Sequence, residues 1–213
     1  AAVVYFGSLA AAFAVVLVVP RVLHRFVVPD VAHPLYGFQH MLATGIARIS
    51  NNKLLNTIFG DSSMILGYLR LVGYDLRSST QTGSNFGVDQ QHDSPFLCSF
   101  DRNTLVSDGL RLLNTETSAT SFVTRRIAMP PDTYLGNDVF YPTNAAVGDN
   151  CLIATKAAIP TMGTPRTNVG ILGSPPFEIP RSVRRDQQFD HYKQPGVIEG
   201  RLRQPTLTHR KAG

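Results

Sequence analysis

The residue with the clearest capacity for acid–base chemistry is His92, which lies in the polar string GVDQQHDSP. An imidazole titrates near neutral pH and can exchange a proton under working conditions. Asp93 or Asp89 could orient the ring, and Asn85 could donate a hydrogen bond to a carbonyl oxygen. We therefore predict His92, Asp93 and Asn85 as catalytic residues. The alternative is that His92 only hydrogen-bonds a turn and that Asn85 forms an ordinary Asx turn.

Metal and nucleotide chemistry find no support in the sequence. Cys98 and Cys151 are the two cysteines, and they lack the CxxC or Cys/His spacing of a metal site. A lone pair is also weak evidence for a disulfide, so we expect buried, reduced thiols and no metal. The string GILGSP lacks GxGxxG and a GK[ST] ending, so it does not predict a nucleotide loop.

A six-residue repeat from about Met129 to Pro160 predicts the elements that must position these side chains. The units read MPPDTY, LGNDVF, YPTNAA, VGDNCL and IATKAA. Their first place is large and apolar and their fifth is small or β-branched; the first-place residues are Met129, Leu135, Tyr141, Val147, Ile153 and Ile159, and the fifth-place residues are Thr133, Val139, Ala145, Cys151 and Ala157. Neither a helix nor an alternating strand has a period of six. We predict a mainly β fold, a left-handed parallel β-helix of the hexapeptide-repeat acyltransferase type.

Four residues on or near the repeats are candidates for binding a cofactor. Lys156 and Asn150 occupy outward places of the cleanest units, where a pantetheine arm can lie along a flat face in related acyltransferases. Arg125 and Arg126 lie between these repeats and a weaker, out-of-phase copy that begins at Val88, and guanidinium groups suit phosphate oxygens. The alternatives are a solvated lysine, a corner asparagine and a solvated loop pair.

The N-terminal string AAVVYFGSLAAAFAVVLVV has no charge and approaches the roughly 20 residues that cross a bilayer as a helix. A secretory signal would carry a basic region first, so we expect a transmembrane helix within a longer polypeptide. Arg21, His24 and Arg25 follow Pro20, and the basic-loop rule then places the downstream region on the cytoplasmic side of the inner (plasma) membrane. A core helix of a larger soluble assembly is the alternative.

These patterns divide the chain into four parts. We expect a transmembrane helix over residues 1–20, a juxtamembrane linker with an amphipathic helix over 21–58, the β-helical domain over 59–180 and a basic tail over 181–213. FQHMLATGIARIS and SSMILGYLRLVG show helical spacing of apolar residues, and they could cap the β-helix or lie on the membrane surface. The tail carries eight Lys/Arg against three Asp/Glu but few interleaved aromatic residues, so we do not expect nucleic-acid recognition.

Several longer strings carry a resemblance to a known family. They are GSNFGVDQQHDSPF, VSDGLRLLN, YLGNDVFYP, GDNCLIATKAAIP and VGILGSPPFEIPRSVRRD. Together they span about Phe59 to Asp186 in order. They resemble the membrane-bound C-terminal region of polylysine-synthetase-type non-ribosomal peptide synthetases, in which tandem β-helical domains follow adenylation domains, carrier domains and membrane helices.

The resemblance implies an amide-bond-forming module that uses aminoacyl thioesters on the phosphopantetheine arm of a carrier. Aminolysis of a thioester asks for a base, for which His92 is the candidate, and for oxyanion donors. The implied partners are the carrier, membrane lipid and sister β-helical domains, arranged as a homotrimer or an intrachain pseudo-trimer. Adenylation and carrier motifs do not occur in these residues, which departs from the whole-enzyme pattern.

Two other functions stay open. A coenzyme A-dependent O- or N-acetyltransferase of the hexapeptide family would need the same fold and a single histidine. A noncatalytic β-helical scaffold would instead complete a site on another subunit.

Overall fold

The computed structural model describes residues 2–60, 62, 64–76 and 88–181. The chain divides into two compact units, Ala1–Pro180 and Arg181–Gly213, and only Arg181 of the second unit is described. The predicted basic tail and Asn85 therefore lie outside the described residues.

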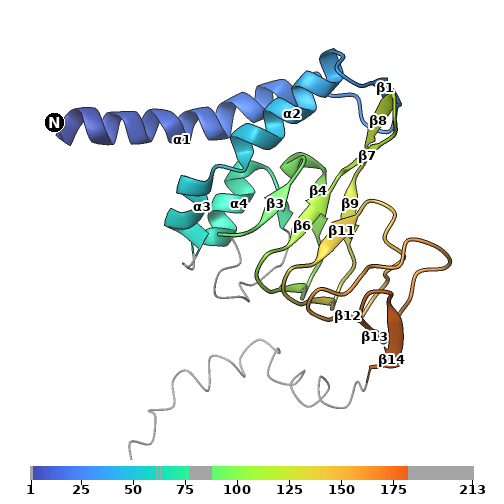
Figure 1. Ribbon diagram of the computed structural model, residues 1–213. Coiled ribbons are helices and arrows are strands. Elements are labelled where there is room, and N and C mark those ends of the chain that lie inside the picture. The colour runs from blue at the N-terminus through green and yellow to red at the C-terminus, as the bar shows by residue number, and fades with distance from the viewer. Residues whose placement is uncertain (1, 61, 63, 77–87, 182–213) are drawn as a thin grey trace, which may run out of the picture. The chain divides into compact units, whose positions relative to one another are not determined.

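The first helix, α1 (Ala2–His24), is the apolar N-terminal segment (Figure 1). It is long and apolar enough to cross a membrane, by length and composition. We expected the helix to end at Pro20, but it continues through this residue to a last turn that contains Arg21 and His24. Positive charges suit this end because the carbonyl dipoles of a helix point toward it. Val16 and Pro20 are buried, so the C-terminal half of α1 packs against the rest of the fold.

Three shorter helices follow, and two of them arise from the strings with helical spacing. α2 (Phe38–Ser50) lies alongside α1 (Figure 1) and buries Leu42 and Ile46, whereas Met41 is 68% exposed. α3 (Lys53–Gly60) and α4 (Ile65–Val72) pack together, with the rings of Phe59 and Tyr68 stacked at a centroid distance of 4.8 Å. The predicted helices at these two strings are confirmed.

The strands of the described residues form four small sheets. One sheet is antiparallel and has the order β1 (His33–Pro34), β8 (Ser121–Thr124) and β7 (Thr115–Thr117). The expected linker thus pairs with the hairpin that contains Thr124 and precedes Arg125.

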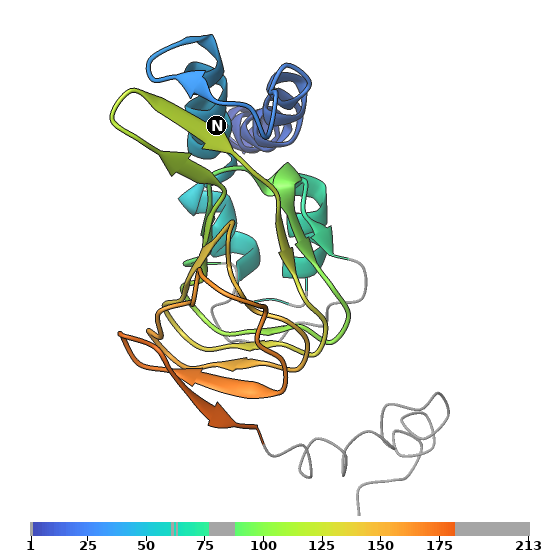
Figure 2. The same ribbon diagram turned by 90° about the vertical axis from the view of Figure 1, so that its right-hand side faces the viewer.

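The other three sheets are built from parallel pairs. Their members are β2 (Asp75–Leu76), β4 (Cys98–Phe100) and β9 (Ile127–Met129); β3 (Gln91–His92), β6 (Arg111–Leu113) and β11 (Phe140–Pro142); and β5 (Leu105–Val106), β10 (Tyr134–Leu135), β12 (Leu152–Ile153) and β13 (Val169–Leu172). A short 3₁₀ helix, η1 (Pro95–Leu97), precedes β4. β14 (Phe177–Pro180) joins the last sheet in antiparallel orientation, so the sheet is mixed (Figure 2).

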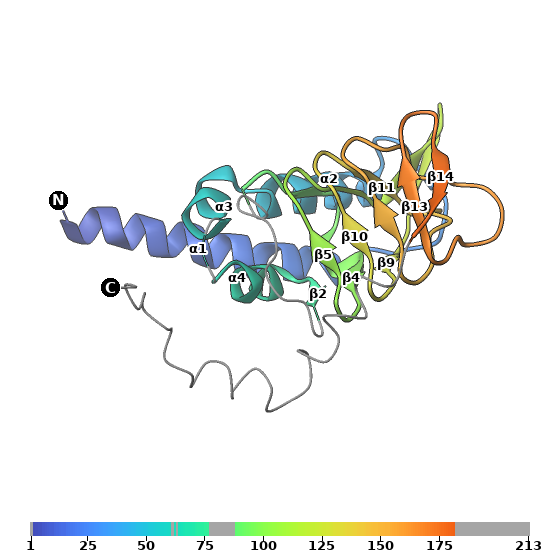
Figure 3. The same ribbon diagram turned by 90° about the horizontal axis from the view of Figure 1, so that it is seen from below.

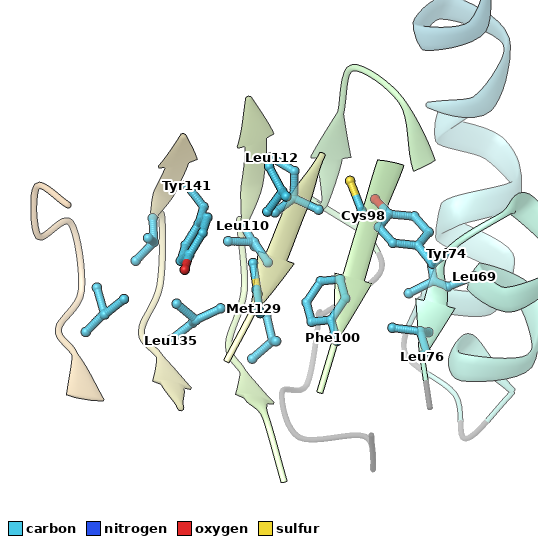
Figure 4. Close-up of a cluster of buried hydrophobic side chains, with 14 of the residues drawn as sticks. Leu69, Tyr74, Leu76, Cys98, Phe100, Leu110, Leu112, Met129, Leu135 and Tyr141 are labelled. Carbon is cyan, nitrogen blue, oxygen red and sulfur yellow. The ribbon is translucent and has the colours of Figure 1, made fainter. Parts of the chain in front are cut away.

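Apolar side chains from these three sheets meet in one core. Val106, Leu135, Ile153 and Ile171 are paired in register along one sheet and are at most 3% exposed. Figure 4 shows Phe100, Met129 and Leu135 in one part of this core and Leu112 and Tyr141 in another. Parallel pairing in register stacks like residues on each other, so the apolar side chains of successive strands form a continuous cluster.

The predicted fold class is wrong. We expected a mainly β, left-handed parallel β-helix, but the described residues have mixed α/β content, with four α-helices and several small parallel and mixed sheets. The six-residue pattern does mark buried positions, since Met129, Leu135, Tyr141 and Ile153 are all buried. Such a pattern reports which side chains point inward over a limited stretch, whereas the helices and the antiparallel pairs obey other periodicities.

Candidate functional site

His92 lies on β3 beneath the helices and is only 6% exposed. Its Nε2 atom is 2.7 Å from Oγ of Ser50, which ends α2. Its Nδ1 atom is 2.6 Å from the hydroxyl oxygen of Tyr74, which follows α4. Both ring nitrogens are therefore hydrogen-bonded to side chains from the helical part of the fold.

The hydrogen bonds around His92 fix the direction of each proton. The Ser50 hydroxyl donates to the carbonyl oxygen of Ile46 at 2.6 Å, which leaves its oxygen to accept from Nε2–H. Nδ1 then accepts from the Tyr74 hydroxyl. Burial lowers the pKa of His92 to about 3, because the charged imidazolium would lose its hydration. In this environment His92 is a neutral ring with both nitrogens satisfied.

The main chain of His92 is held as firmly as its ring. Oδ1 of Asn51 accepts from the His92 amide at 3.1 Å, and the Asn51 side-chain amide donates to the His92 carbonyl at 2.6 Å. Ser50, Asn51 and Tyr74 thus join the helices to β3. This arrangement gives His92 a clear role in fixing the helices against the sheets.

Asp93 does not orient the His92 ring. Its Oδ2 atom accepts a hydrogen bond from the backbone amide of Thr115 at 2.9 Å. Burial raises the pKa of this carboxyl, and the hydrogen bond from Thr115 acts against that rise. Asp89, the other carboxylate that we expected near His92, is exposed at the surface. The predicted catalytic group therefore separates into a buried histidine and a carboxylate that caps a strand.

A second buried network centres on Asn114, which is fully buried. Its Oδ1 atom accepts from the Ser94 amide at 3.2 Å and from the Cys98 thiol at 3.3 Å. Its amide nitrogen donates to the carbonyl oxygens of Leu97 and Arg125, at 3.4 and 3.2 Å. Burial raises the pKa of Cys98, so this thiol stays protonated and unreactive. Both cysteines are free and buried, as predicted.

A surface cleft lies on the outward side of β6 and β11, and Lys156 lines it. Its volume is about 510 Å³. The apolar lining comes from Leu113, Phe140, Pro142, Ala157, Ala158 and Ile159, and the polar lining from Asp138, Lys156 and Ser174. We call this cleft the Lys156 groove. Phe140 is 50% exposed and Leu113 is 39% exposed, so apolar surface is open to a ligand there.

Charged groups stand at the rim of the Lys156 groove. The ammonium nitrogen of Lys156 is 3.8 Å from Oδ2 of Asp138, and both side chains are mostly exposed. The guanidinium carbon of Arg111 lies 5.0 Å from the centre of the Phe140 ring. Lys156 has a positive φ of 56°, which is uncommon for a lysine and directs its side chain from a tight corner. The groove thus combines apolar side chains with the Lys156–Asp138 pair, and Arg111 lies over the ring of Phe140, which lines the groove.

The other predicted cofactor-binding residues do not line the Lys156 groove. Asn150 donates to Oδ1 of Asn168 at 2.8 Å at a different corner. Arg125 lies 3.3 Å from the Glu116 carboxylate on the β7–β8 hairpin. Arg126 lines a smaller, separate pocket with Asp75, Ser99, Phe100, Asp101, Ala128 and Met129. Of the four predicted residues, only Lys156 is placed beside this apolar surface.

Sequence reasoning missed the residues that surround Lys156 and His92. Phe140 of β11 is paired with Arg111 of β6, and both side chains point outward. The sequence signal that could have indicated a binding surface was a large aromatic residue, Phe140, at an outward position of the repeat. Ser50 and Tyr74 lie far from His92 in sequence, and no local pattern connects them. Asp138 carries only the ordinary signature of a corner carboxylate.

No family model matches the chain, and no curated protein matches it. Among residues 2–60, 62, 64–76 and 88–181, no three His, Cys, Asp or Glu side chains are grouped in a way that could hold a metal ion.

Proposed function

We propose that this chain is a membrane-tethered module that binds an aminoacyl thioester through its pantetheine arm and supports its conversion to an amide. The observation that carries the proposal is the Lys156 groove, with its apolar side chains, its Lys156–Asp138 pair and Arg111 over the Phe140 ring. The length and composition of α1 support the tether. The resemblance of the chain to polylysine-synthetase-type peptide synthetases supports the reaction.

The chemistry of the arm matches that of the groove. A phosphopantetheine arm is a chain of methylene groups and two amides that ends in a phosphate at one end and a thioester at the other. Phe140, Leu113 and Ile159 offer apolar surface to the methylene groups, while the Ser174 hydroxyl is positioned to bond an amide. Lys156 and Arg111 offer positive charge to the phosphate.

In the proposed reaction the protein positions the thioester and the amine and offers a group that can accept a proton. The acceptor amine attacks the thioester carbonyl, a C–N bond forms and the C–S bond breaks. The arm leaves as a thiol, whose proton comes from the attacking nitrogen. Holding the thioester still raises the rate by removing translational freedom. Asp138 is the carboxylate that lines the groove and can accept the amine proton on its way to sulfur.

This proposal assigns no proton transfer to His92. Its ring nitrogens are 2.6 and 2.7 Å from other side chains, and it does not line the Lys156 groove. Its place in the proposal is to hold the helices against the sheets. The downstream sheets would then face the cytoplasm next to the plasma membrane, with a carrier domain and sister modules as partners.

The test is a binding and turnover assay with the full chain in detergent. Binding of a carrier with a loaded phosphopantetheine arm would be measured by fluorescence anisotropy, and amide product with a free amine by mass spectrometry. Phe140→Ala and Lys156→Gln are expected to weaken arm binding. Met162→Ala is the matched control, because Met162 is 83% exposed and does not line the groove. Equal binding by all variants would overturn the proposed site.

The donor is distinguished in the same assay. Acetyl coenzyme A carries the same arm. Acetylated amine formed from it without any carrier would favour the coenzyme A-dependent acetyltransferase hypothesis. Amide product that forms from the loaded carrier but not from acetyl coenzyme A supports the peptide-synthetase hypothesis.

A noncatalytic scaffold is the second candidate, and the buried state of His92 favours it. A ring whose nitrogens are both satisfied within the fold is not available to a substrate. Arm binding without any amide product from the wild-type chain would support this function.

A further inference from the structure

An apolar groove of about 260 Å³ lies between α1 and α3. One wall consists of Phe6, Leu9, Ala10 and Phe13 from α1, and the other of Leu55, Ile58 and Phe59 from α3. All the described residues that line it have apolar side chains. We call it the α1–α3 groove, and Figure 3 shows α3 alongside α1 at this place.

Aromatic stacking sets the depth of this groove. The rings of Phe13 and Phe59 are 6.0 Å apart, and both meet Tyr68 of α4, at 6.4 and 4.8 Å. The stack closes the inner end, while the outer rim is open, with Phe6 64% and Ile58 50% exposed. The stacked rings therefore support the inner side of an apolar groove whose rim is open.

The charges of the helices indicate what covers this groove. α1, α2, α3 and α4 contain Arg21, Arg48, Lys53 and Arg70 but no aspartate or glutamate. Helices that form an apolar groove and whose charged residues are all positive are complementary to lipids with apolar tails and anionic headgroups. Lys53 is exposed at the first position of α3, the helix that forms one wall.

We infer that the α1–α3 groove binds an acyl chain of an anionic phospholipid, with α3 in contact with the same membrane as α1. This inference rests on the proposed membrane tether. It adds that the bilayer contacts two helices of the fold. Leu54, which is 61% exposed on α3, then faces lipid as well.

The chain contains no tryptophan, so one introduced indole reports its own surroundings without background. Three full-length variants would be reconstituted into vesicles of phosphatidylglycerol and phosphatidylcholine with brominated acyl chains. The variants are Ile58→Trp, Phe6→Trp and Met162→Trp. Bromine quenches an indole on contact. We expect quenching for Ile58→Trp and Phe6→Trp and none for Met162→Trp.

The outcomes separate this inference from the tether itself. Quenching of the Phe6→Trp variant but not of the Ile58→Trp variant is consistent with α1 as a membrane tether and overturns lipid binding by α3. Absence of quenching at Phe6→Trp overturns the tether as well. Equal quenching at Ile58→Trp in vesicles of phosphatidylcholine alone overturns the preference for anionic lipid.

Occupancy of the groove is tested by filling it. Ala10 lines the α1–α3 groove, whereas the exposed Ala12 on the same helix does not. Phospholipid that co-purifies with the full chain in detergent would be identified and counted by mass spectrometry. Ala10→Phe is expected to lose this lipid and Ala12→Phe to keep it. Equal lipid in both variants overturns the assignment of the groove.

Discussion

The hydroxyl oxygen of Tyr74 lies 2.6 Å from Nδ1 of His92, at the point where the segment after α4 meets β3. The two rings meet edge to face at an interplanar angle of 88°, with centroids 5.2 Å apart. Both side chains are almost completely buried. This contact therefore joins the helical part of the fold to the parallel sheets.

Removing the Tyr74 hydroxyl should destabilise the fold. Tyr74→Phe leaves Nδ1 of His92 buried without a donor, which costs about 1–3 kcal/mol of unfolding free energy. Urea unfolding followed by circular dichroism measures the loss. Tyr36→Phe is the matched control, because Tyr36 is 87% exposed and should change little. Equal stability of both variants would show that the bond does not hold the helices.

Stability should fall as the pH falls from about 6.5 toward about 3. The His92 pKa is lowered from its usual 6.5 to about 3 in the fold, so in this range only the unfolded chain takes up the proton. The expected slope is up to about 1.4 kcal/mol for each pH unit. Unfolding free energies near pH 7 and near pH 5 give the measurement.

Replacing His92 isolates this contribution. Asp93 acts with the opposite sign, because burial raises its pKa and the folded chain takes up its proton first on acidification. His92→Gln keeps Asp93, so the difference in slope between the wild type and this variant belongs to His92. An unchanged slope would contradict the assignment of a neutral, desolvated imidazole.

Asn114→Ala should be among the more damaging single substitutions in the chain. It removes the partner of the Ser94 amide and of two carbonyl oxygens. Buried groups left without partners cost about 1–3 kcal/mol each, and the thermal unfolding midpoint should fall clearly. Asn144→Ala, at an exposed position, is the control. A midpoint that falls equally in both variants would contradict a special role for Asn114.

Two glycines should respond to alanine in opposite directions. A Cβ at Gly136 would lie 2.5 Å from the backbone nitrogen of Thr155, so Gly136→Ala forces neighbouring strands apart and should cost about 1–3 kcal/mol. A Cβ at Gly67 meets nothing within 4 Å, and Gly67→Ala should add about 0.5–1 kcal/mol to helix α4. Chemical unfolding of the two variants measures both. A stabilising Gly136→Ala would show that the strands have room to separate.

Local patterns in the sequence predicted some of this structure well. α1 follows from its uninterrupted apolar run, and α2 and α4 follow from apolar spacing. The six-residue units mark buried positions such as Leu135 and Ile153 because inward-facing residues must be apolar in each unit. The fold class was still wrong, since the repeats cover about thirty residues and do not report the helices and antiparallel strands around them.

The site was harder to predict because it depends on contacts between distant residues. Lys156 was found from its outward place. Phe140 lines the same groove, and Arg111 lies over the Phe140 ring because β6 pairs with β11, which no local pattern reports. His92 looked catalytic because its local sequence is polar. Its burial comes from Ser50 and Tyr74, which no spacing rule connects to it.

The reversed direction of β14 has a consequence for self-association. β14 pairs with β13 in antiparallel orientation and covers an edge on which another strand would otherwise align. It contains Glu178 and ends at Pro180, which has no amide hydrogen to offer a neighbouring chain. Two further prolines, Pro175 and Pro176, stand in the turn before it. A chain cut after Leu172 would expose β13 and should tend to form strand-to-strand oligomers at high concentration.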